Sequence, residues 1–321
     1  MKQSDGIIIA AVGGLYTVRC DDEEIIRCPA RGVFRHQGIT PLVGDRVTVE
    51  YDPEKLAERR KDEKKGEAVT RGSAADGYIA KVHPRRSELI RPPVANIDLL
   101  YITAAAAKPD PQTIVIDKMT CVAEHSGIEP VIIVTKLDLA PERAEELVKI
   151  YKLAGYRAFA VSVTSGTGDL EALREFVKTE GAGKISAFAG VSGAGKSTIL
   201  GYIYPHYKPE VGEVSRKLGR GRHTTRTVTL YETEGGGYIA DTPGFSLLDF
   251  TNFDFIELDD LVHAFREFQP YLGMCRYRDC SHTKEEECAI LAALEEGKIA
   301  RSRHDSYLAL RAELKSKNPW K

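Results

Sequence analysis

The chain has 321 residues, of which 42% are hydrophobic and 29% are charged, and its formal net charge is −2. This balance suits a globular protein with a sizeable core, and the length predicts two or three domains of roughly 150 residues each. The near-neutral charge excludes an overall basic surface, so any nucleic-acid contact has to be local. We find no export signal and no run of ~18 apolar residues that could span a membrane. We therefore expect a cytoplasmic protein without membrane contact, and we expect it to be a monomer.

The first ninety residues consist of short apolar runs broken by Gly, Pro and Asp. Such runs predict strands, here at residues 6–12, 15–19, 32–35 and 46–51. Five or so short strands in this length indicate a small β-barrel, for which an OB-fold is the candidate. Residues 55–67 interrupt the strands with interleaved charges, as either a solvated excursion or a loop that touches RNA. We assign residues 1–90 to an OB-fold RNA-binding domain.

From residue 96 onward, strand-like runs alternate with helical patterns. Strands are expected at residues 97–103, 131–135, 158–162, 185–189, 228–233 and 238–241, with helices at 142–153 and 170–177. Asp110-Pro111 has the pattern of a capping residue followed by proline at the first helical position. This alternation predicts an α/β domain with a mostly parallel sheet, which we place at residues 91–250.

A phosphate-binding loop follows the strand at 185–189. Residues 190–197 read Gly-Val-Ser-Gly-Ala-Gly-Lys-Ser and fit G-x-x-x-x-G-K-[ST] at every fixed position, with a helical run behind them. The glycines let backbone N–H groups converge on a phosphate at a helix N-terminus. Lys196 is expected to reach the β- and γ-phosphates, and Ser197 to bind Mg²⁺. The expected nucleotide contacts in this loop are Gly190, Ser192, Gly193, Ala194, Gly195, Lys196, Ser197 and Thr198.

The identity of the base is indicated by Thr135-Lys136-Leu137-Asp138, at the end of another apolar strand. The Asp138 carboxylate can accept hydrogen bonds from N1–H and the exocyclic amine of guanine, and adenine offers neither in that geometry. The stem of Lys136 can lie over the base, and Thr135 belongs to the same contact set. Ser162 ends the next strand and is either part of the base pocket or an ordinary strand-terminating serine. The nucleotide is therefore expected to be GTP.

A third nucleotide motif is Asp241-Thr242-Pro243-Gly244, which again closes a strand. Asp241 would hold Mg²⁺ through water, and the Gly244 N–H would sense the γ-phosphate. The base motif comes before the phosphate loop along the chain. The motifs therefore follow the cyclic order of a Ras-like GTPase, but the chain starts at a different motif. A circular permutation keeps the site, because function depends on position in space and not on chain order.

The catalytic group is harder to predict. Ras-like enzymes carry a water-orienting Gln directly after D-x-x-G, but this chain has Phe245 there. His223 is the nearest polar candidate, because it precedes Thr224 and Thr225, one of which is expected to bind Mg²⁺ together with Ser197. The alternative is that His223 only packs within a loop.

Three cysteines and one histidine lie close together near the end of the chain. Cys275, Cys280, His282 and Cys288 supply three thiolates and one imidazole, a full tetrahedral set for one structural zinc ion. Buried or reactive free thiols are the alternative. We assign residues 251–321 to a mostly helical zinc-binding domain, with helices at 291–299 and 307–314.

These motifs and their flanks resemble one family, the RsgA or YjeQ GTPases that depend on the small ribosomal subunit. The resemblance covers nearly the whole chain and includes residues 41–47 (PLVGDRV), 91–98 (RPPVANID), 192–197 (SGAGKS), 221–226 (GRHTTR), 241–245 (DTPGF) and the cysteine cluster. It implies an OB-fold, a permuted GTPase domain and a zinc domain. It also implies a GTPase that binds the small subunit and its rRNA, assists or checks late maturation, and is stimulated by that particle to convert GTP to GDP.

The chain departs from that family in three places. Thr135 stands where the family usually has Asn, which removes an amide that would help to fix the base. Val163 replaces the usual Ala after Ser162, and residues 284–287 replace the usual Glu-Pro-Gly before the last cysteine. The third change alters a loop and not the metal ligands.

RNA contact is expected at three groups of residues, each of which could instead be an ordinary solvated surface. On the barrel they are Arg31, Phe34, Arg35 and His36. Before and within the switch they are Arg216, Lys217, Arg220, Arg222 and Arg226. At the basic end they are Arg301, Arg303, His304, Arg311, Lys315, Lys317 and Lys321. Two other functions stay open from sequence: an RNA-binding module whose hydrolysis is incidental, and a metabolic ATPase.

Overall fold

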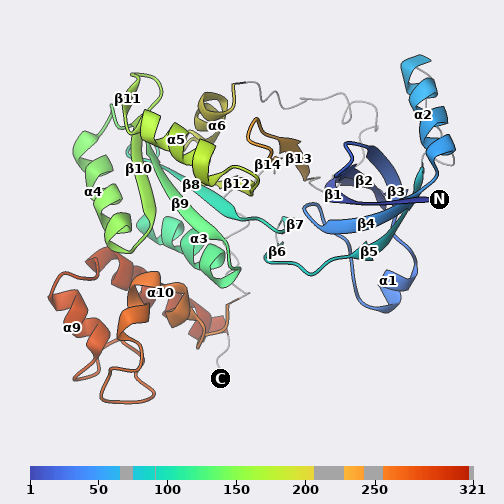
Figure 1. Cartoon of the computed structure of the whole chain (residues 1–321). Coiled ribbons are helices and arrows are strands. Elements are labelled where there is room, and N and C mark those ends of the chain that lie inside the picture. Colours follow the sequence, from blue (N-terminus) through green and yellow to red (C-terminus); the bar gives the residue numbers. More distant parts are fainter. Residues whose placement is uncertain (66–74, 91, 206–227, 242–255, 318–321) are drawn as a thin grey trace. The chain divides into compact units, whose positions relative to one another are not determined.

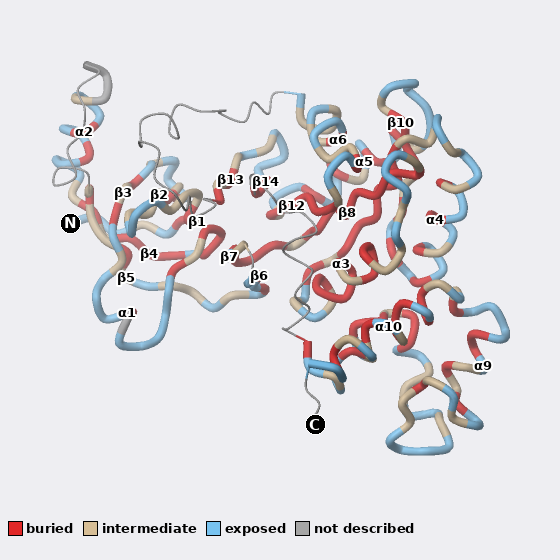
Figure 2. Tube along the Cα trace, turned by 180° about the vertical axis from the view of Figure 1, so that it is seen from behind, coloured by how far each residue is buried: buried red, intermediate tan, exposed pale blue. Residues whose placement is uncertain are grey.

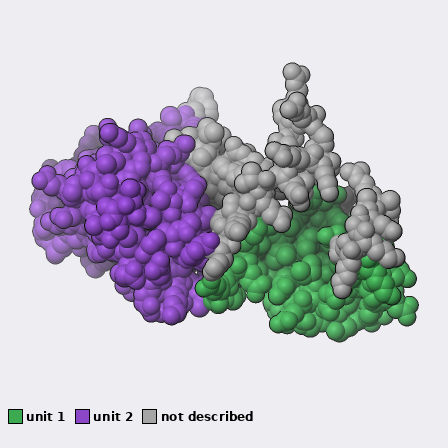
Figure 3. Space-filling view, turned by 90° about the horizontal axis from the view of Figure 1, so that it is seen from above, with its two compact units in different colours: residues 1–97, 209–244 green, residues 98–208, 245–321 purple. Residues whose placement is uncertain are grey.

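The computed structural model describes residues 1–65, 75–90, 92–205, 228–241 and 256–317 (Figure 1). The chain forms two compact units: Met1–Ile97 with Pro209–Gly244, and Asp98–Lys208 with Phe245–Lys321 (Figure 3). Each unit is described by itself below. The division at residues 90 and 250 into three domains stays a prediction. Within the described residues, no helix combines the length and the apolar character that a membrane crossing requires.

The first unit is built on five antiparallel strands: β1 (Lys2–Val12), β2 (Leu15–Cys20), β3 (Ile25–Pro29), β4 (Arg46–Tyr51) and β5 (Gly77–Val82). The pairs are β1 with β2, β2 with β3, β1 with β4, and β4 with β5. A parallel bridge between Ala30 and Ile79 joins the end of β3 to β5, so the ring of strands closes. Alternate apolar side chains point inward and are fully buried, among them Ile8, Val18, Ile26, Val47, Val49 and Ile79.

Two short hairpins complete this unit. One pairs β6 (Glu88–Ile90) with β7 (Pro93–Ala95), and the other pairs β13 (Thr229–Glu232) with β14 (Tyr238–Asp241). The second hairpin joins the barrel through Ala10, which pairs with Thr229.

One local expectation for this unit is corrected. The strand at residues 32–35 is wrong, because Val33–His36 form the short helix α1 and Phe34 turns into the core with 6% exposure. The charged stretch expected to be a solvated excursion between strands is largely helical, since residues 53–65 form helix α2 (Pro53–Lys65) between β4 and β5. Arg59 of α2 is buried, and its Nε lies 2.9 Å from Asp76 Oδ1. One charge of the stretch therefore forms an internal ion pair.

The second unit contains the predicted parallel sheet, which is confirmed. Its strands β8 (Leu99–Ala105), β9 (Glu129–Thr135), β10 (Arg157–Ser162) and β12 (Ile185–Ala189) pair in the order β10-β9-β8-β12. The two-residue strand β11 (Thr167–Gly168) adds antiparallel to β10. All seven residues of β8 are buried, as expected for a strand covered on both faces. Figure 2 shows β8 as a buried strand.

Four helices connect or follow these strands: α3 (Thr113–His125), α4 (Pro141–Leu153), α5 (Leu170–Glu180) and α6 (Lys196–Ile203). Helix α3 begins later than Asp110-Pro111 predicted. Gln112 is its N-cap and is still extended, with ψ 105°, so Pro111 is not the first helical residue.

The segment after residue 256 packs within the second unit. It contains the 3-10 helices η1 (Leu261–Ala264) and η2 (Arg266–Tyr271) and the helices α9 (Ala289–Glu295) and α10 (Arg301–Lys317). Both η1 and α10 contact α3. Helix α9 ends earlier than predicted because Gly297, with φ +72°, closes it: the Lys298 N–H donates to Ala293 O at 2.9 Å.

Candidate nucleotide and metal sites

The base motif and the phosphate loop lie at the same edge of the parallel sheet. Thr135 ends β9, Ser162 ends β10, and the loop at 190–197 follows β12. Because β8, β9, β10 and β12 are parallel, their carboxyl ends share one edge, which is where α/β proteins bind nucleotides. The sequence order of the motifs is reversed, but the fold brings them together.

The phosphate loop depends on three glycines with positive φ: Gly190 at 144°, Gly193 at 78° and Gly195 at 88°. At Gly190 a Cβ atom would lie 2.3 Å from the carbonyl oxygen of Thr103, so only glycine fits there. Gly195 is the N-cap of α6, so the loop ends at a helix N-terminus. The arrangement places successive backbone N–H groups where an anion can accept from them.

Lys196 is half-buried, and its ammonium donates to Gly190 O at 2.6 Å and to Val191 O at 3.0 Å. Burial lowers its pKa from the usual lysine value. A phosphate beside it would favour the charged form again, because an opposite charge raises the pKa of an amine. The loop thus holds the lysine at a position where a bound anion would be stabilised by its positive charge.

The base-recognition turn leaves β9 with Lys136 in the left-handed region at φ 58°. The Lys136 ammonium donates to Lys108 O, and the Leu137 N–H donates to Val161 O at 3.2 Å. Asp138 is exposed on this turn. The turn begins at Thr135, which contacts the phosphate loop, and an exposed carboxylate on it is able to accept hydrogen bonds from a purine edge.

Ser162 is buried, and its hydroxyl accepts a hydrogen bond from the Ser165 N–H at 3.3 Å. This contact is the usual one of a serine that ends a strand and starts a turn. A contact between Ser162 and the base stays a prediction.

Several predicted site residues lie outside the described residues. They are His223, Thr224, Thr225, Gly244 and the basic stretch at 216–226, together with Lys321. Asp241 ends β14, as expected, but its side chain is not described, and neither is that of Arg35.

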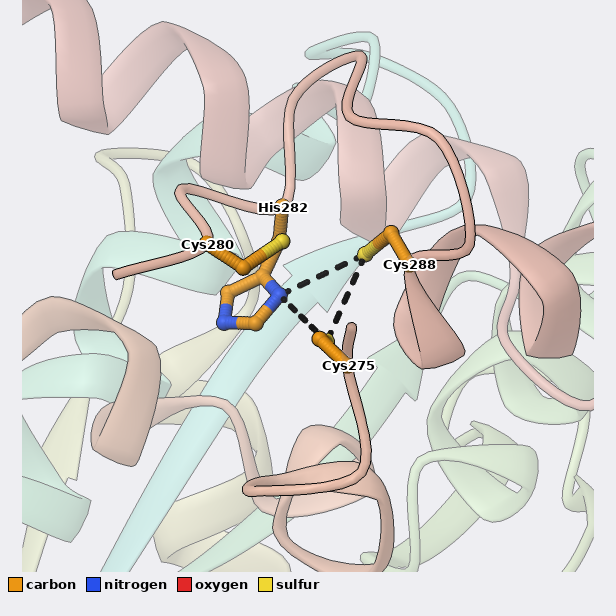
Figure 4. A group of neighbouring side chains, drawn as sticks. All are labelled: Cys275, Cys280, His282 and Cys288. Atoms are coloured by element: carbon orange, nitrogen blue, oxygen red, sulfur yellow. Dashed lines mark hydrogen bonds between the residues drawn. The ribbon is translucent and has the colours of Figure 1, made fainter. Parts of the chain in front are cut away.

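The cysteine cluster gathers as predicted. The ligand atoms of Cys275, Cys280, His282 and Cys288 all lie within 4.8 Å of one another (Figure 4). The Sγ atoms of Cys275 and Cys288 are 3.8 Å apart, and His282 Nδ1 lies 3.5 and 3.4 Å from them. A tetrahedral zinc with bonds of about 2.3 Å to sulfur and 2.0 Å to nitrogen has edges of about 3.5–3.8 Å. The donor set and its spacing therefore fit one zinc ion.

Metal binding at this cluster requires its thiols to lose their protons. Burial raises the pKa of Cys280 to about 12, so this side chain is a neutral thiol until a metal displaces its proton. Burial lowers the pKa of His282, which keeps the imidazole neutral and able to bind a metal.

Two supports of this cluster were not recognised from sequence. The Glu285 carboxylate accepts from the backbone N–H groups of Ser281 at 3.0 Å, Thr283 at 2.8 Å and Lys284 at 3.0 Å. From helix α10, His304 Nε2 lies 2.9 Å from His282 O. Residues 284–287 are thus more than a changed loop, since Glu285 ties together the backbone around a ligand.

The expectation of an RNA-facing basic end is wrong for Arg303 and His304, which are 0% and 3% exposed. Arg303 donates to Asp117 at 2.7 Å and to Glu267 at 2.6 Å. It also donates to the Thr120 hydroxyl at 3.0 Å. Two buried carboxylates explain the buried guanidinium, and this network joins α10 to α3 and η2.

The barrel candidates are also divided. Phe34 is buried and cannot stack on a base. Arg31 is exposed, but its guanidinium lies 4.0 Å from the Tyr78 ring centroid and pairs with Glu50 at 3.2 Å. His36 is exposed and remains a candidate.

A phosphate loop that follows its base motif along the chain defines a circularly permuted GTPase. The family model described as RsgA GTPase matches residues 82–251, and that of the RsgA N-terminal domain matches residues 5–57. The chain belongs to the RsgA GTPase family.

Relatives match over nearly their whole length. The small ribosomal subunit biogenesis GTPase RsgA of Caldanaerobacter subterraneus is 40% identical, covering 99% of this chain and 98% of that protein. The RsgA 2 protein of Oceanobacillus iheyensis is 39% identical, covering 98% and 99%. The crystal structure of YjeQ from Thermotoga maritima has a TM-score of 0.75 at 32% identity, covering 98% of this chain and 99% of that chain. The structure of YloQ, a circularly permuted GTPase, has a TM-score of 0.74 at 28% identity, covering 100% and 98%.

Proposed function

We propose that this protein is a GTPase that binds the small ribosomal subunit and its rRNA and assists or checks late maturation, with hydrolysis stimulated by the subunit. The observation that carries the proposal is the meeting of base motif and phosphate loop at one sheet edge in a chain of this family. The printed names of the full-length relatives supply the biological context. Such work belongs in the cytoplasm, and the protein acts there as a monomer without membrane contact.

The phosphate loop, from Gly190 to Thr198, takes the phosphates of GTP or GDP. Its N–H groups and Lys196 hold the β- and γ-phosphates, and Ser197 binds Mg²⁺ with one of Thr224 and Thr225. Asp241 reaches the metal through water, and the Gly244 N–H responds to the γ-phosphate. The loop geometry and the position of Lys196 support this assignment.

Asp138 reads the guanine edge, and Lys136 and Ser162 line the base. Support comes from the exposed Asp138 on a turn that begins beside the phosphate loop. Excess ATP is therefore expected not to displace bound GTP, which separates this reading from a metabolic ATPase.

The remaining domains provide binding and stability. The closed five-strand ring supports an OB-fold at residues 1–90, followed by a GTPase domain to residue 250 and a zinc-binding domain to residue 321. Exposed basic residues such as His36 on the barrel and Arg301 on α10 are the surfaces offered to rRNA. The zinc is structural, because all four of its ligand positions are protein atoms.

The deciding experiment is GTP turnover with and without purified small subunits, at two salt concentrations. Stimulation that weakens at higher salt is expected, because contacts to phosphates are salt-dependent. Large subunits serve as the control. Equal turnover with and without small subunits would favour an RNA-binding module whose hydrolysis is incidental.

His223 is the proposed catalytic residue and positions the attacking water, a role that Phe245 cannot fill. His223→Ala is expected to keep GTP affinity within a few-fold and to lose stimulated hydrolysis by at least ~10²-fold. Single-turnover assays with saturating subunits measure this. Stimulated turnover near the wild-type rate would move the role to a ribosomal group or to Arg222 or Arg226.

A further inference from the structure

Strand β1 of the barrel changes its partner along one of its edges. Its first part pairs with β4 as far as Ile7, which lies opposite Arg46. Further along the same edge, Ala10 pairs with Thr229 of β13. The edge of a strand presents N–H and C=O groups, which a neighbouring strand can satisfy. The β13–β14 hairpin therefore occupies the part of the β1 edge that lies beyond β4 (Figure 1).

Thr229 connects the barrel to Asp241 through the backbone. It lies between Ala10 of β1 and Asp241 of β14, because β13 pairs with both of these strands. The three residues form one row across three neighbouring strands. Adjacent strands are ~4.8 Å apart, so the backbone of Asp241 lies about 10 Å from that of β1. Strand pairing alone therefore connects the barrel to the strand end that carries Asp241.

An ion pair holds the other end of the hairpin on the barrel. Arg19 Nη2 of β2 lies 3.4 Å from Oε2 of Glu232, the last residue of β13. Glu232 pairs with Tyr238 at the start of β14. Burial raises the pKa of Tyr238, and the positive charges of Arg19 and Arg46 on the barrel oppose that rise. The hairpin is thus attached to the barrel near both of its ends.

We propose that Arg19 and Thr229 are positioning residues for GTP hydrolysis, which fix the strand end carrying Asp241 to the barrel. Neither touches nucleotide. Thr229 acts through the backbone of β14, and Arg19 acts through Glu232. The barrel thereby sets the position of Asp241, which in the proposed function reaches Mg²⁺ through water. The inference rests on that proposed function, and it gives the barrel a part in hydrolysis as well as in rRNA binding.

Thr229→Pro tests the backbone link. The N–H and C=O of a residue in an antiparallel strand point to the same neighbour, so those of Thr229 bond either to β1 or to β14. Proline removes the N–H in either case and opens one of the two ladders between Ala10 and Asp241. Thr229→Val keeps the N–H and is the matched control. GTP turnover of the full-length protein is measured over a range of Mg²⁺ concentrations, and the affinity for fluorescent GDP is measured without Mg²⁺.

The Mg²⁺ concentration that gives half-maximal turnover should rise in Thr229→Pro by about 10- to 150-fold. This is the range expected for losing a hydrogen bond between a carboxylate and a metal-bound water. The GDP affinity without Mg²⁺ should stay near the wild-type value, which a general loss of structure would not allow. Thr229→Val should match wild type in both measurements. Melting temperatures show whether each variant is folded.

Charge reversal tests the ion pair. Arg19→Glu places a like charge beside Glu232, and the double variant Arg19→Glu/Glu232→Arg restores the pair with its charges exchanged. Lys2→Glu is the matched control, because it breaks another exposed ion pair of the barrel, with Asp22, that involves no hairpin residue. Arg19→Glu is expected to raise the half-maximal Mg²⁺ concentration by about 1.5- to 5-fold, and the double variant to restore it.

An unchanged half-maximal Mg²⁺ concentration in folded Thr229→Pro would overturn the backbone link. A shift in Arg19→Glu that the double variant fails to restore, or an equal shift in Lys2→Glu, would remove Arg19 from the proposal. If Thr229→Pro does not fold, the charge-exchange series decides alone. Turnover of the wild-type protein that does not depend on Mg²⁺ would instead contradict the proposed function, and that result is distinguishable because it concerns the unsubstituted chain.

Discussion

The phosphate loop and the C-terminal segment, residues 256–317, belong to the same compact unit but are held by different forces. Neutral hydrogen bonds to backbone carbonyls and positive-φ glycines shape the phosphate loop. Buried charges and a cluster of four metal-binding side chains shape the C-terminal segment. Removing one neutral bond leaves a polar group unpaired, whereas removing one buried charge leaves its partners ionised in a dry environment. The second region should therefore be far less tolerant of substitution.

Metal removal is expected to have the largest effect. Structural zinc sites contribute on the order of 10 kcal/mol of binding free energy, so chelation should unfold the segment around Cys280. GTP binding should largely survive, because the loop contacts come from β8 and β9. Elemental analysis should find one zinc per chain, lost in Cys280→Ser and kept in Cys20→Ser. Protein purified without chelators and found free of zinc would contradict the assignment.

Arg303→Met should have the next largest effect, a loss of about 3–5 kcal/mol in the free energy of unfolding. The change leaves Asp117 and Glu267 buried without a counter-charge. Urea denaturation measures the loss, with Arg301→Met as the exposed control, expected within about 0.5 kcal/mol of wild type.

The Arg303→Met deficit should also depend on pH. Burial already raises the pKa of Asp117, and losing Arg303 raises it further above the unfolded value. The folded variant then binds more protons than the unfolded chain, so the deficit should shrink as the pH falls from about 7 to 5. Equal losses in Arg303→Met and Arg301→Met would show that the buried network contributes nothing.

The two regions also differ in how much of their structure the sequence predicts. Features local in sequence could be predicted, and contacts between distant residues could not. The phosphate loop is contiguous and the four metal ligands lie within one short window, so spacing alone pointed to both. Arg303 and Asp117 are 186 positions apart, and nothing in the basic run around Arg303 distinguishes a buried guanidinium from an exposed one. The contact of Thr103 with the phosphate loop was missed because its only signal is the place of Thr103 on a strand beside the loop. Helix α2 was missed because its charges resemble those of an open surface.

Asp138→Asn tests the recognition of guanine by the base motif. Losing charged hydrogen bonds should cost about 1.5–3 kcal/mol, or about 10- to 150-fold in GTP affinity. The variant should favour xanthosine triphosphate, whose 2-oxo group prefers a donor. Asp110→Asn, also exposed, is the control and should keep the guanine preference. Unchanged GTP affinity in Asp138→Asn would remove Asp138 from the base pocket.

Glu285→Gln should have the smallest effect, about 1 kcal/mol in zinc affinity measured by chelator competition. Burial acts to raise the Glu285 pKa, but hydrogen bonds from Ser281, Thr283 and Lys284 outweigh it and lower the pKa. Its contribution is therefore present above the unfolded pKa and is lost as the pH falls through the folded one. Glu286→Gln, at an exposed position, should bind zinc like wild type. A loss in Glu286→Gln as large as in Glu285→Gln would assign the effect to net charge.

The ion pair between Asp117 and Arg303 also constrains when the core can form during synthesis of the chain. Its two partners are 186 residues apart, so at about 5–20 residues per second Asp117 leaves the ribosome about 10–40 s before Arg303. Until Arg303 emerges, Asp117 has no guanidinium to pair with, and the face of α3 that packs against α10 stays hydrated. The α/β unit can therefore complete its core only near the end of synthesis, after its nucleotide motifs have been translated. A nascent chain that binds nucleotide early would do so with an unfinished interior.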